Sequence, residues 1–224
     1  MKKYAIIVAG GSGKRMGSEI PKQFLALQKK PILFQTLHKF ENICDDIILV
    51  LPENQIEYFH KLCKKFKFNT KAKIVTGGIE RFHSVKNGLD QLNLDNEAVV
   101  AVHDAVRPLV SKELIIKSFE CAYSHGNCVV AVPSKDSLRK ISEGKSKSVT
   151  RSEYFMVQTP QVFNLNILKE AYQQEYNNFT DDASVLESLG LNIHLLEGEY
   201  SNIKITTKED LIIAEALLKS GFCE

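Results

Sequence analysis

The chain has 224 residues, a length that favours one large α/β domain with an excursion over two separate domains. Its 44% hydrophobic and 25% charged residues are an ordinary globular composition, which excludes disordered, collagen-like and low-complexity proteins. The 29 basic and 27 acidic residues leave a net charge of +2, and the pI of about 8.2 lies below the value of about 9 typical of nucleic-acid-binding domains. We therefore expect a few placed cations, rather than a basic surface, to bind any phosphate.

Apolar runs and cysteines disfavour secretion, membrane insertion and a structural metal. The apolar run at residues 4–9 follows two lysines but stops at Gly10, short of the ~7–15 apolar residues of a signal peptide. No run approaches the ~18 apolar residues of a membrane span. The 5 cysteines are odd in number and never spaced CxxC, so neither a disulfide framework nor a zinc site is indicated. We expect a cytoplasmic protein.

Short runs rich in valine and isoleucine recur along the chain and are apolar on both faces, as strands buried in a parallel sheet are. They cover residues 4–9, 46–51, 73–76, 98–102 and 128–132. Segments of helix length lie between them, at residues 31–40, 53–66, 84–92 and 112–125. Pro31 and Pro52 suit first helical turns and Gly126 a helix end. This alternation predicts a doubly wound α/β sheet, in which ligands gather at the carboxyl ends of the strands.

One polar segment, residues 134–154, interrupts this alternation. It is rich in serine, lysine and glutamate and holds Gly144, so it is either a hairpin arm that leaves the sheet or an irregular surface loop. Beyond it we expect three helices and one strand, at residues 164–176, 181–189, 207–218 and 192–196. Thr180 is a candidate N-cap and Gly190 a candidate C-cap. No linker divides the chain, so residues 1–224 are predicted to form one domain.

A glycine-rich loop directly follows the first predicted strand. It reads Ala9-Gly10-Gly11-Ser12-Gly13-Lys14-Arg15-Met16-Gly17. Such glycines let backbone amides approach phosphate oxygens closely. A P-loop would need glycine at the position of Val8 and serine or threonine at that of Arg15, and a dinucleotide fingerprint from Gly11 would need glycine at Met16. The pattern favours a phosphate-binding loop of another kind, supplemented by Lys22, or else a tight glycine turn with solvated lysines.

Further blocks accompany this loop in a fixed order. They are Pro21-Lys22-Gln23-Phe24, Gly77-Gly78-Ile79-Glu80-Arg81-Phe82-His83-Ser84-Val85, Val102-His103-Asp104-Ala105-Val106-Arg107-Pro108, Thr159-Pro160-Gln161, Thr180-Asp181-Asp182-Ala183-Ser184 and Asn202-Ile203-Lys204-Ile205-Thr206. Over the whole chain, this set resembles the 2-C-methyl-D-erythritol 4-phosphate cytidylyltransferases of the non-mevalonate isoprenoid pathway. The resemblance implies a mostly parallel, Rossmann-like nucleotidyltransferase sheet with a β-arm at about residues 134–157.

The implied reaction transfers the CMP moiety of CTP to methylerythritol phosphate, giving 4-diphosphocytidyl-2-C-methyl-D-erythritol and pyrophosphate, with Mg²⁺ bound mainly through the CTP phosphates. A phosphate monoester is already ionised at neutral pH, with a second pKa near ~6, so the reaction needs no general base. Catalysis is then mostly positioning and neutralisation of charge. The resemblance makes Arg15 and Lys22 the catalytic residues. The alternative is that both are ordinary surface cations.

The resemblance also divides the remaining site residues between the two substrates. Those implied for CTP are Ala9, Gly10, Gly11, Gly13, Gly78, Arg81 and Ser84. Those implied for methylerythritol phosphate are Asp104, Ala105, Arg107, Ser137, Arg151, Thr159, Thr180 and Lys204. Ser84 is also a candidate N-cap for the next helix, and the two roles are compatible.

Four of the charged or titratable positions carry alternatives. Asp104 follows a predicted strand and is able to bind substrate hydroxyls or to help hold magnesium. Arg107 is either a third cation for phosphate or a partner of Asp104. His103 is interpreted as structural, because the chemistry needs no base. Lys204 lies between two isoleucines in an expected strand, so its head must emerge at a strand end or meet an anion.

Arg151 lies on the expected arm. In the family such an arm crosses to a second subunit, so the resemblance implies a homodimer with shared sites, and no nucleic-acid or membrane partner is expected. A solvated arm arginine is the alternative.

Two departures from the family pattern, Gly10 and Val106, also occur in ribitol-5-phosphate cytidylyltransferases, which are the runner-up. Ser84-Val85 and the 180–184 block with Glu187 favour the erythritol substrate. A regulatory protein without turnover would be expected to lack one of the catalytic or phosphate-binding cations, all of which are present. A dehydrogenase is disfavoured by the failed fingerprint.

Overall fold

The computed structural model describes residues 1–10, 16–18, 20–95 and 97–221. Its centre is a seven-stranded sheet in the order β11-β7-β10-β6-β1-β4-β5. The strands are β1 (Lys3–Val8), β4 (Asp46–Leu51), β5 (Lys73–Thr76), β6 (Val99–Asp104), β7 (Asn127–Pro133), β10 (Phe155–Asn164) and β11 (Leu195–Glu197). Only β10 runs antiparallel to its neighbours in this sheet, so the predicted mostly parallel α/β fold is confirmed.

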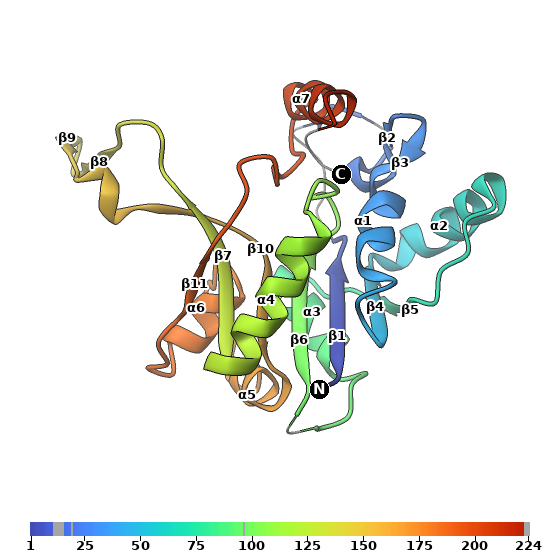
Figure 1. Ribbon diagram of the computed structural model, residues 1–224, viewed down its shortest axis with the longest axis horizontal. Coiled ribbons are helices and arrows are strands. Elements are labelled where there is room, and N and C mark those ends of the chain that lie inside the picture. Colours follow the sequence, from blue (N-terminus) through green and yellow to red (C-terminus); the bar gives the residue numbers. More distant parts are fainter. Residues whose placement is uncertain (11–15, 19, 96, 222–224) are drawn as a thin grey trace.

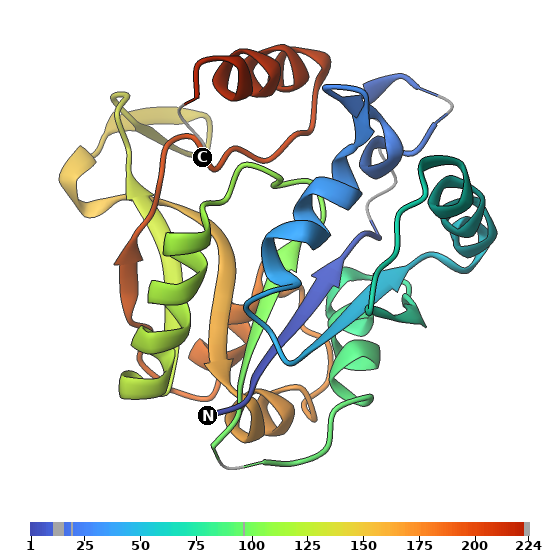
Figure 2. The ribbon, with the colours of Figure 1, turned by 45° about the vertical axis from the view of Figure 1, so that its right-hand side comes forward.

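Helices cover both faces of the sheet (Figures 1 and 2). One face carries α1 (Ile32–Phe40), α2 (Glu53–Phe66) and α4 (Lys112–His125), and the other carries α3 (Arg81–Leu89), α5 (Leu165–Ala171) and α6 (Asp182–Glu187). Along β1, successive side chains alternate between the two cores, which is why this strand is apolar on both faces. A third, smaller core lies beneath α7 (Lys208–Lys219). None of the described helices is long and apolar enough to cross a membrane.

The polar segment forms the predicted hairpin arm. Strands β8 (Arg139–Ser142) and β9 (Lys145–Ser148) pair antiparallel as a separate small sheet, and Gly144 turns between them with a φ of 73°. Every residue of both strands is exposed. Figure 1 shows the arm projecting away from the central sheet, so the irregular-loop alternative is wrong.

Strand β10, which the sequence pattern did not predict, is the main correction to the fold. Its buried stretch holds polar residues and Pro160, and the register shifts between Val157 and Gln161. Proline and polar side chains disfavour a central strand, but pairing with β6 and β7 outweighs that local preference.

Smaller corrections concern caps and bounds. The N-cap of α6 is Asp181 rather than Thr180, because the Asp181 side chain accepts a hydrogen bond from the Ser184 amide. The expected strand around Lys204 is irregular chain instead. The expected helix at residues 164–176 ends early, at Ala171. A short hairpin of β2 (Ala26–Leu27) and β3 (Lys30–Pro31), with 3₁₀ turns η2 (Lys22–Phe24) and η3 (Arg151–Glu153), completes the elements.

Candidate active site

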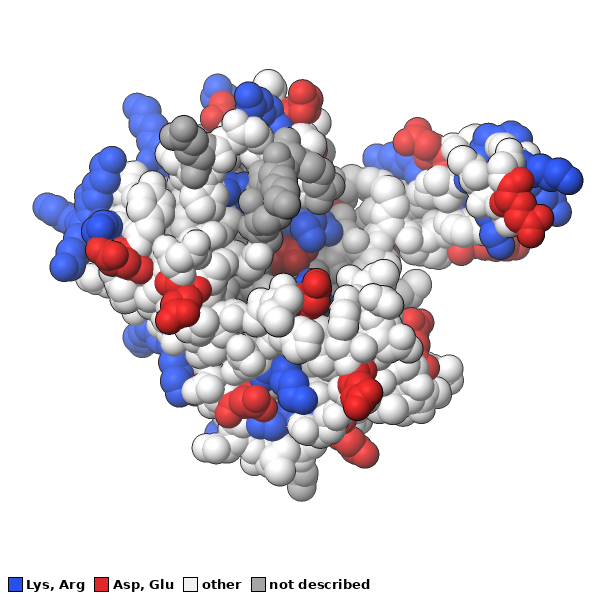
Figure 3. Space-filling model, turned by 180° about the vertical axis from the view of Figure 1, so that it is seen from behind, with Lys and Arg blue, Asp and Glu red and all other residues white. Residues whose placement is uncertain are grey.

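Many of the predicted site residues that the structure describes converge at the carboxyl ends of the neighbouring strands β1 and β6. A cleft of about 340 Å³ opens there, which we name the first compartment. It is lined by Val8, Ala9, Gly10, Lys22, Gln23, Gly78, Ile79, Glu80, Arg81, Ser84, Asp104, Val106 and Lys204. Figure 3 shows a hollow on this side of the molecule in which basic and acidic side chains lie close together.

A second compartment of about 300 Å³ adjoins the first. Its lining comes mainly from β10 and from the loop before α6: Arg81, Asp104, Arg107, Val157, Gln158, Thr159, Gln161, Thr180, Asp181 and Lys204. Arg81, Asp104 and Lys204 line both compartments, and we call these three residues the shared wall. Two ligands bound on either side of this wall would be in contact range of the same charged groups.

Asp104 is the acidic centre of the shared wall, and three cations surround it. The Lys204 ammonium lies 3.0 Å and the Arg107 Nε 3.4 Å from Oδ2, while the Arg81 Nε lies 3.9 Å from Oδ1. Burial alone raises the pKa of this carboxyl, but the neighbouring Lys204, Arg81 and Arg107 lower that pKa well below its usual value. Asp104 is therefore an ionised hydrogen-bond acceptor at neutral pH. Arg107 pairs with it and also donates to the Asn202 carbonyl at 2.7 Å.

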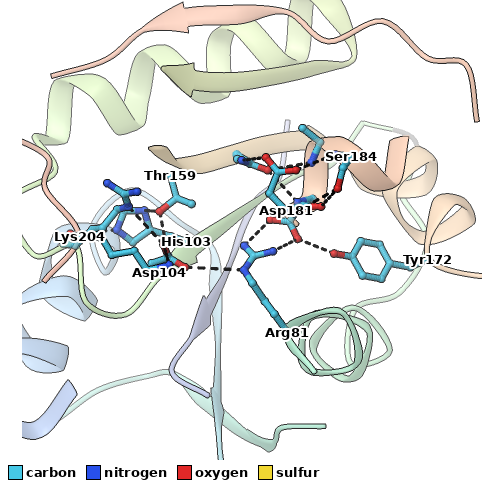
Figure 4. A network of polar contacts seen from close by, with 12 residues as sticks. Arg81, His103, Asp104, Thr159, Tyr172, Asp181, Ser184 and Lys204 are labelled. Atoms are coloured by element: carbon cyan, nitrogen blue, oxygen red, sulfur yellow. Dashed lines mark hydrogen bonds and ion pairs between the residues drawn. The ribbon is translucent and has the colours of Figure 1, made fainter. Parts of the chain in front are cut away.

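Arg81 is itself held by a buried carboxylate. Its two terminal nitrogens donate to the two oxygens of Asp182 at 2.8 and 2.6 Å, and the Tyr172 hydroxyl donates to the same carboxylate at 2.6 Å (Figure 4). Asp182 is 0% exposed and begins α6, whereas Arg81 begins α3. Burial lowers the pKa of Arg81, but the Asp182 and Asp104 carboxylates raise it by more than burial lowers it, so the guanidinium stays charged.

His103 is buried behind the second compartment and links three elements. Its Nε2 lies 3.1 Å from the Arg107 carbonyl oxygen, which only accepts, so Nε2 carries the proton. The other nitrogen, Nδ1, then accepts from the Thr159 hydroxyl at 3.1 Å, and the Thr159 oxygen accepts from the Asp104 amide at 3.0 Å. Burial lowers the pKa of His103 to about 4, so the ring is neutral. This placement supports the structural interpretation of His103.

Gln161 on β10 fixes the loop that borders the second compartment. Its side-chain oxygen accepts from the amides of Asp182 and Ala183 at 3.1 and 3.0 Å, and its nitrogen donates to Asp181 at 2.8 Å. One side chain thus satisfies the first amides of α6 and orients its N-cap carboxylate. Thr180, predicted for the substrate, borders the same compartment.

Hydrogen bonds from buried side chains fix the two loops that line the first compartment, one at Ala9 and the other at Gly78. Ser84 lies one turn inside α3 and is not its N-cap, which is Glu80; the Ser84 Oγ accepts from the Gly78 amide at 3.1 Å. A Cβ on Gly78 would lie 2.3 Å from that of His83, so the loop requires glycine there. Gln23, which sequence reasoning missed, is 1% exposed and donates to the Ala9 carbonyl at 2.9 Å.

Several predicted residues lie elsewhere. Ala105 is in the core, and its amide donates to the Val8 carbonyl, so it does not line either compartment. Ser137 and Arg151 are exposed on the arm, where the Arg151 guanidinium donates to the Lys135 carbonyl at 2.7 Å. The predictions for Gly11, Gly13 and Arg15 fall outside the described residues.

A sequence model described as 2-C-methyl-D-erythritol 4-phosphate cytidylyltransferase matches residues 4–220. The chain belongs to this family. A protein of that name from Bacteroides fragilis is 47% identical over 221 residues, covering 97% of this chain and 100% of that protein, and one from Clostridium botulinum is 45% identical, covering 97% and 98%. Family members are cytidylyltransferases, so the chain is a nucleotidyltransferase.

Solved structures of the family share the fold. The enzyme of this name from Thermus thermophilus is 31% identical, with a TM-score of 0.81 over 98% of this chain and 100% of that one. The 4-diphosphocytidyl-2C-methyl-D-erythritol synthase from Anaerococcus prevotii is 30% identical, with a TM-score of 0.83 over 97% of this chain and 96% of that one.

Proposed function

We propose that the chain transfers the CMP moiety of CTP to 2-C-methyl-D-erythritol 4-phosphate, with CTP in the first compartment and the polyol phosphate in the second. The observation that carries this assignment is the shared wall, because the attacking phosphate and the α-phosphorus must meet between two separately bound substrates. The first compartment has the glycine loops and Lys22 that a triphosphate needs. The second has carboxylate, hydroxyl and amide groups suited to a polyol.

In this reaction a phosphate oxygen of the polyol substrate forms a bond to the α-phosphorus of CTP. The bond from that phosphorus to the bridging oxygen of pyrophosphate breaks, and pyrophosphate leaves with the electron pair. The attacking oxygen is already ionised, so no side chain has to remove a proton. The work of the protein is to bring two polyanions together, for which Lys22, Lys204 and, from outside the described residues, Arg15 are the proposed cations.

Asp104 is the proposed ligand for hydroxyl groups of the polyol. It stays ionised, and its Oδ2 is engaged by Lys204 and Arg107, while Oδ1 lies 3.9 Å from the Arg81 Nε. Lys204 lies beside both compartments, so it is placed to contact the attacking phosphate and to approach the α-phosphate as charge shifts during transfer.

Magnesium is proposed to enter with CTP. Among the described residues no group of three or more histidine, cysteine or acidic side chains is arranged to hold a metal, and the Asp104 carboxylate is ringed by cations. That donor set fits an ion held mostly by phosphate oxygens and water, with Asp104 supplying at most one ligand. When bound, the ion would neutralise triphosphate charge.

The arm is proposed to pack against a second copy of the chain. Its residues Ser137 and Arg151 are exposed and stand apart from the compartments of their own subunit. The strand that returns from the arm exposes four consecutive apolar side chains, Tyr154 to Val157, each between 41% and 48%. Exposed apolar side chains on a projecting segment favour an interaction site, and the resemblance to the family leads us to propose that Arg151 reaches the second compartment of the neighbouring subunit.

A pyrophosphate-release assay with CTP, magnesium and methylerythritol phosphate tests this function. We expect release to depend on both substrates, and ribitol 5-phosphate at the same concentration to give at least ten-fold slower release. Equal or faster release with ribitol 5-phosphate would assign the runner-up activity instead. The comparisons support the erythritol substrate, since the relatives matched over nearly their whole length carry that name.

A further inference from the structure

Arg81 occupies an unusual position in the shared wall, because it lies between two carboxylates and bonds only one of them. Both terminal nitrogens are taken by Asp182, at 2.8 and 2.6 Å. Its Nε lies 3.9 Å from Asp104 Oδ1, beyond hydrogen-bond distance. The other oxygen of Asp104 is already engaged by Lys204 and Arg107. The orientation of Arg81 therefore decides whether Oδ1 is available to a substrate.

The partner that sets this orientation is buried and itself supported. Asp182 is 0% exposed, and a buried carboxylate is stable only with a full set of hydrogen bonds and an opposite charge. Arg81 supplies the charge, and the hydroxyl of Tyr172, which is 1% exposed, supplies a further bond at 2.6 Å. The Tyr172 ring also stacks on Phe82, the residue after Arg81, at 4.6 Å between ring centroids.

We propose that Asp182 and Tyr172 are positioning residues that hold the Arg81 guanidinium away from Asp104, so that Oδ1 of Asp104 stays free to accept a hydroxyl of the polyol substrate. Without this hold, Arg81 turns its terminal nitrogens toward Asp104, the nearest remaining carboxylate, and forms a two-bond ion pair that blocks the acceptor. Neither residue lines either compartment, so both act through Arg81. The inference rests on the proposed binding of methylerythritol phosphate beside Asp104.

The same contacts also join α3 to α6, so a purely structural role must be distinguished. A structural role predicts less folded enzyme and a lower unfolding temperature, with both KM values changed equally or not at all. A positioning role predicts a larger rise in the KM for methylerythritol phosphate than in the KM for CTP, because only the polyol is proposed to use Oδ1, whereas Arg81 lines both compartments.

Tyr172→Phe is the first variant, because it removes one hydroxyl and keeps the ring stacked on Phe82. We expect the KM for methylerythritol phosphate to rise about three- to ten-fold and the KM for CTP to stay within two-fold, since one hydrogen bond to a charged group is lost. Tyr176→Phe is the matched control: Tyr176 packs in the same aromatic cluster, at 5.7 Å from Phe82, but is 38% exposed. Equal behaviour of the two variants would overturn the inference.

Asp182→Asn removes the charged partner of Arg81, and we expect the KM for methylerythritol phosphate to rise more than in Tyr172→Phe, by about ten-fold or more, because a charge-assisted hydrogen bond is worth about 1.5–3 kcal/mol. If Asp182 acts through Arg81, then adding Asp182→Asn to an Arg81→Met variant should cause no further rise in the KM for methylerythritol phosphate. Additive effects of the two substitutions would contradict the proposal. If Asp182→Asn does not fold, Tyr172→Phe still decides. Asp104→Asn distinguishes failure of the proposed substrate site from failure of the positioning role. If this variant leaves the KM for methylerythritol phosphate unchanged, the proposed substrate site is wrong. If it raises that KM while Tyr172→Phe and Asp182→Asn do not, only this inference fails.

Discussion

Replacing Asp104 with asparagine tests the shared wall most directly. The substitution keeps the shape of the side chain but removes the charge that Lys204, Arg107 and Arg81 surround. The three cations and one carboxylate sum to +2, and without the carboxylate the sum is +3, so attraction for phosphate does not fall. What is lost is a charged acceptor for substrate hydroxyls.

The size of the effect follows from that lost acceptor. A hydrogen bond to a charged group is worth about 1.5–3 kcal/mol, which corresponds to roughly a 10- to 150-fold change in affinity. We therefore expect Asp104→Asn to raise the KM for methylerythritol phosphate by that factor, with the KM for CTP unchanged or lower. The fold should survive, because Arg107 keeps its 2.7 Å bond to the Asn202 carbonyl.

Steady-state pyrophosphate release with each substrate varied in turn measures both constants. Asp90→Asn, an exposed aspartate at the far end of α3, is the control for a generic loss of charge, and circular dichroism checks that both variants fold. A rise in the KM for CTP equal to or larger than that for methylerythritol phosphate would refute the assignment of the two compartments.

Four further predictions address other parts of the site. Lys22→Ala should lower kcat by at least 100-fold and change the KM for CTP by less than ten-fold, because transition-state charge is stabilised more than ground-state charge; unchanged turnover would exclude a catalytic role. Gly78→Ala should weaken CTP binding about ten-fold or more in titration calorimetry without unfolding the protein, since the new Cβ would lie 2.3 Å from that of His83 and displace the loop. Burial lowers the pKa of His103 from 6.5 to about 4, so as the pH falls the unfolded state takes up a proton at a higher pH than the folded state does. The free energy of unfolding, measured in urea, should therefore be highest above pH 6.5 and fall toward pH 4, by about 2 kcal/mol between pH 7 and 5. His103→Gln should flatten this dependence. Mixing Lys22→Ala with Arg151→Ala protein should restore activity if sites are shared, because one site of each mixed dimer is intact, whereas no gain on mixing would contradict shared sites.

Where local pattern and tertiary context agree, the elements were predicted closely. Strands β4 and β5 and helices α2 and α4 have the bounds that their apolar runs and flanking residues indicate. β10 was missed for the opposite reason. Its buried polar residues are stabilised by partners distant in sequence, such as the Asp182 amide that donates to Gln161, and no local pattern shows these partners.

The site residues also fall into those that a local motif indicates and those that only tertiary contacts reveal. Glycine loops and the cations that follow them are local signals, because phosphate binding needs small residues and positive charge close together in the chain. Lys22 and Gly78 were therefore predicted from such signals and Asp104 from its motif block, and all three line the first compartment. Tyr172 gave no such signal: an aromatic residue at a helix end is typical of a core, and only its hydroxyl contact distinguishes it.

By itself, the sequence of 224 residues predicted an α/β fold from its periodicity, and its short motifs resemble those of a nucleotidyltransferase family with a β-arm. The polar pattern of the arm left a hairpin and an irregular loop equally open. Only the tertiary structure decided which charged residues of those motifs pair with one another. Arg81 meets a carboxylate 101 residues away, and Lys204 meets Asp104 across a similar span of chain. Such contacts depend on which strands neighbour one another in the folded sheet. A net charge near zero therefore conceals three cations gathered around one buried carboxylate.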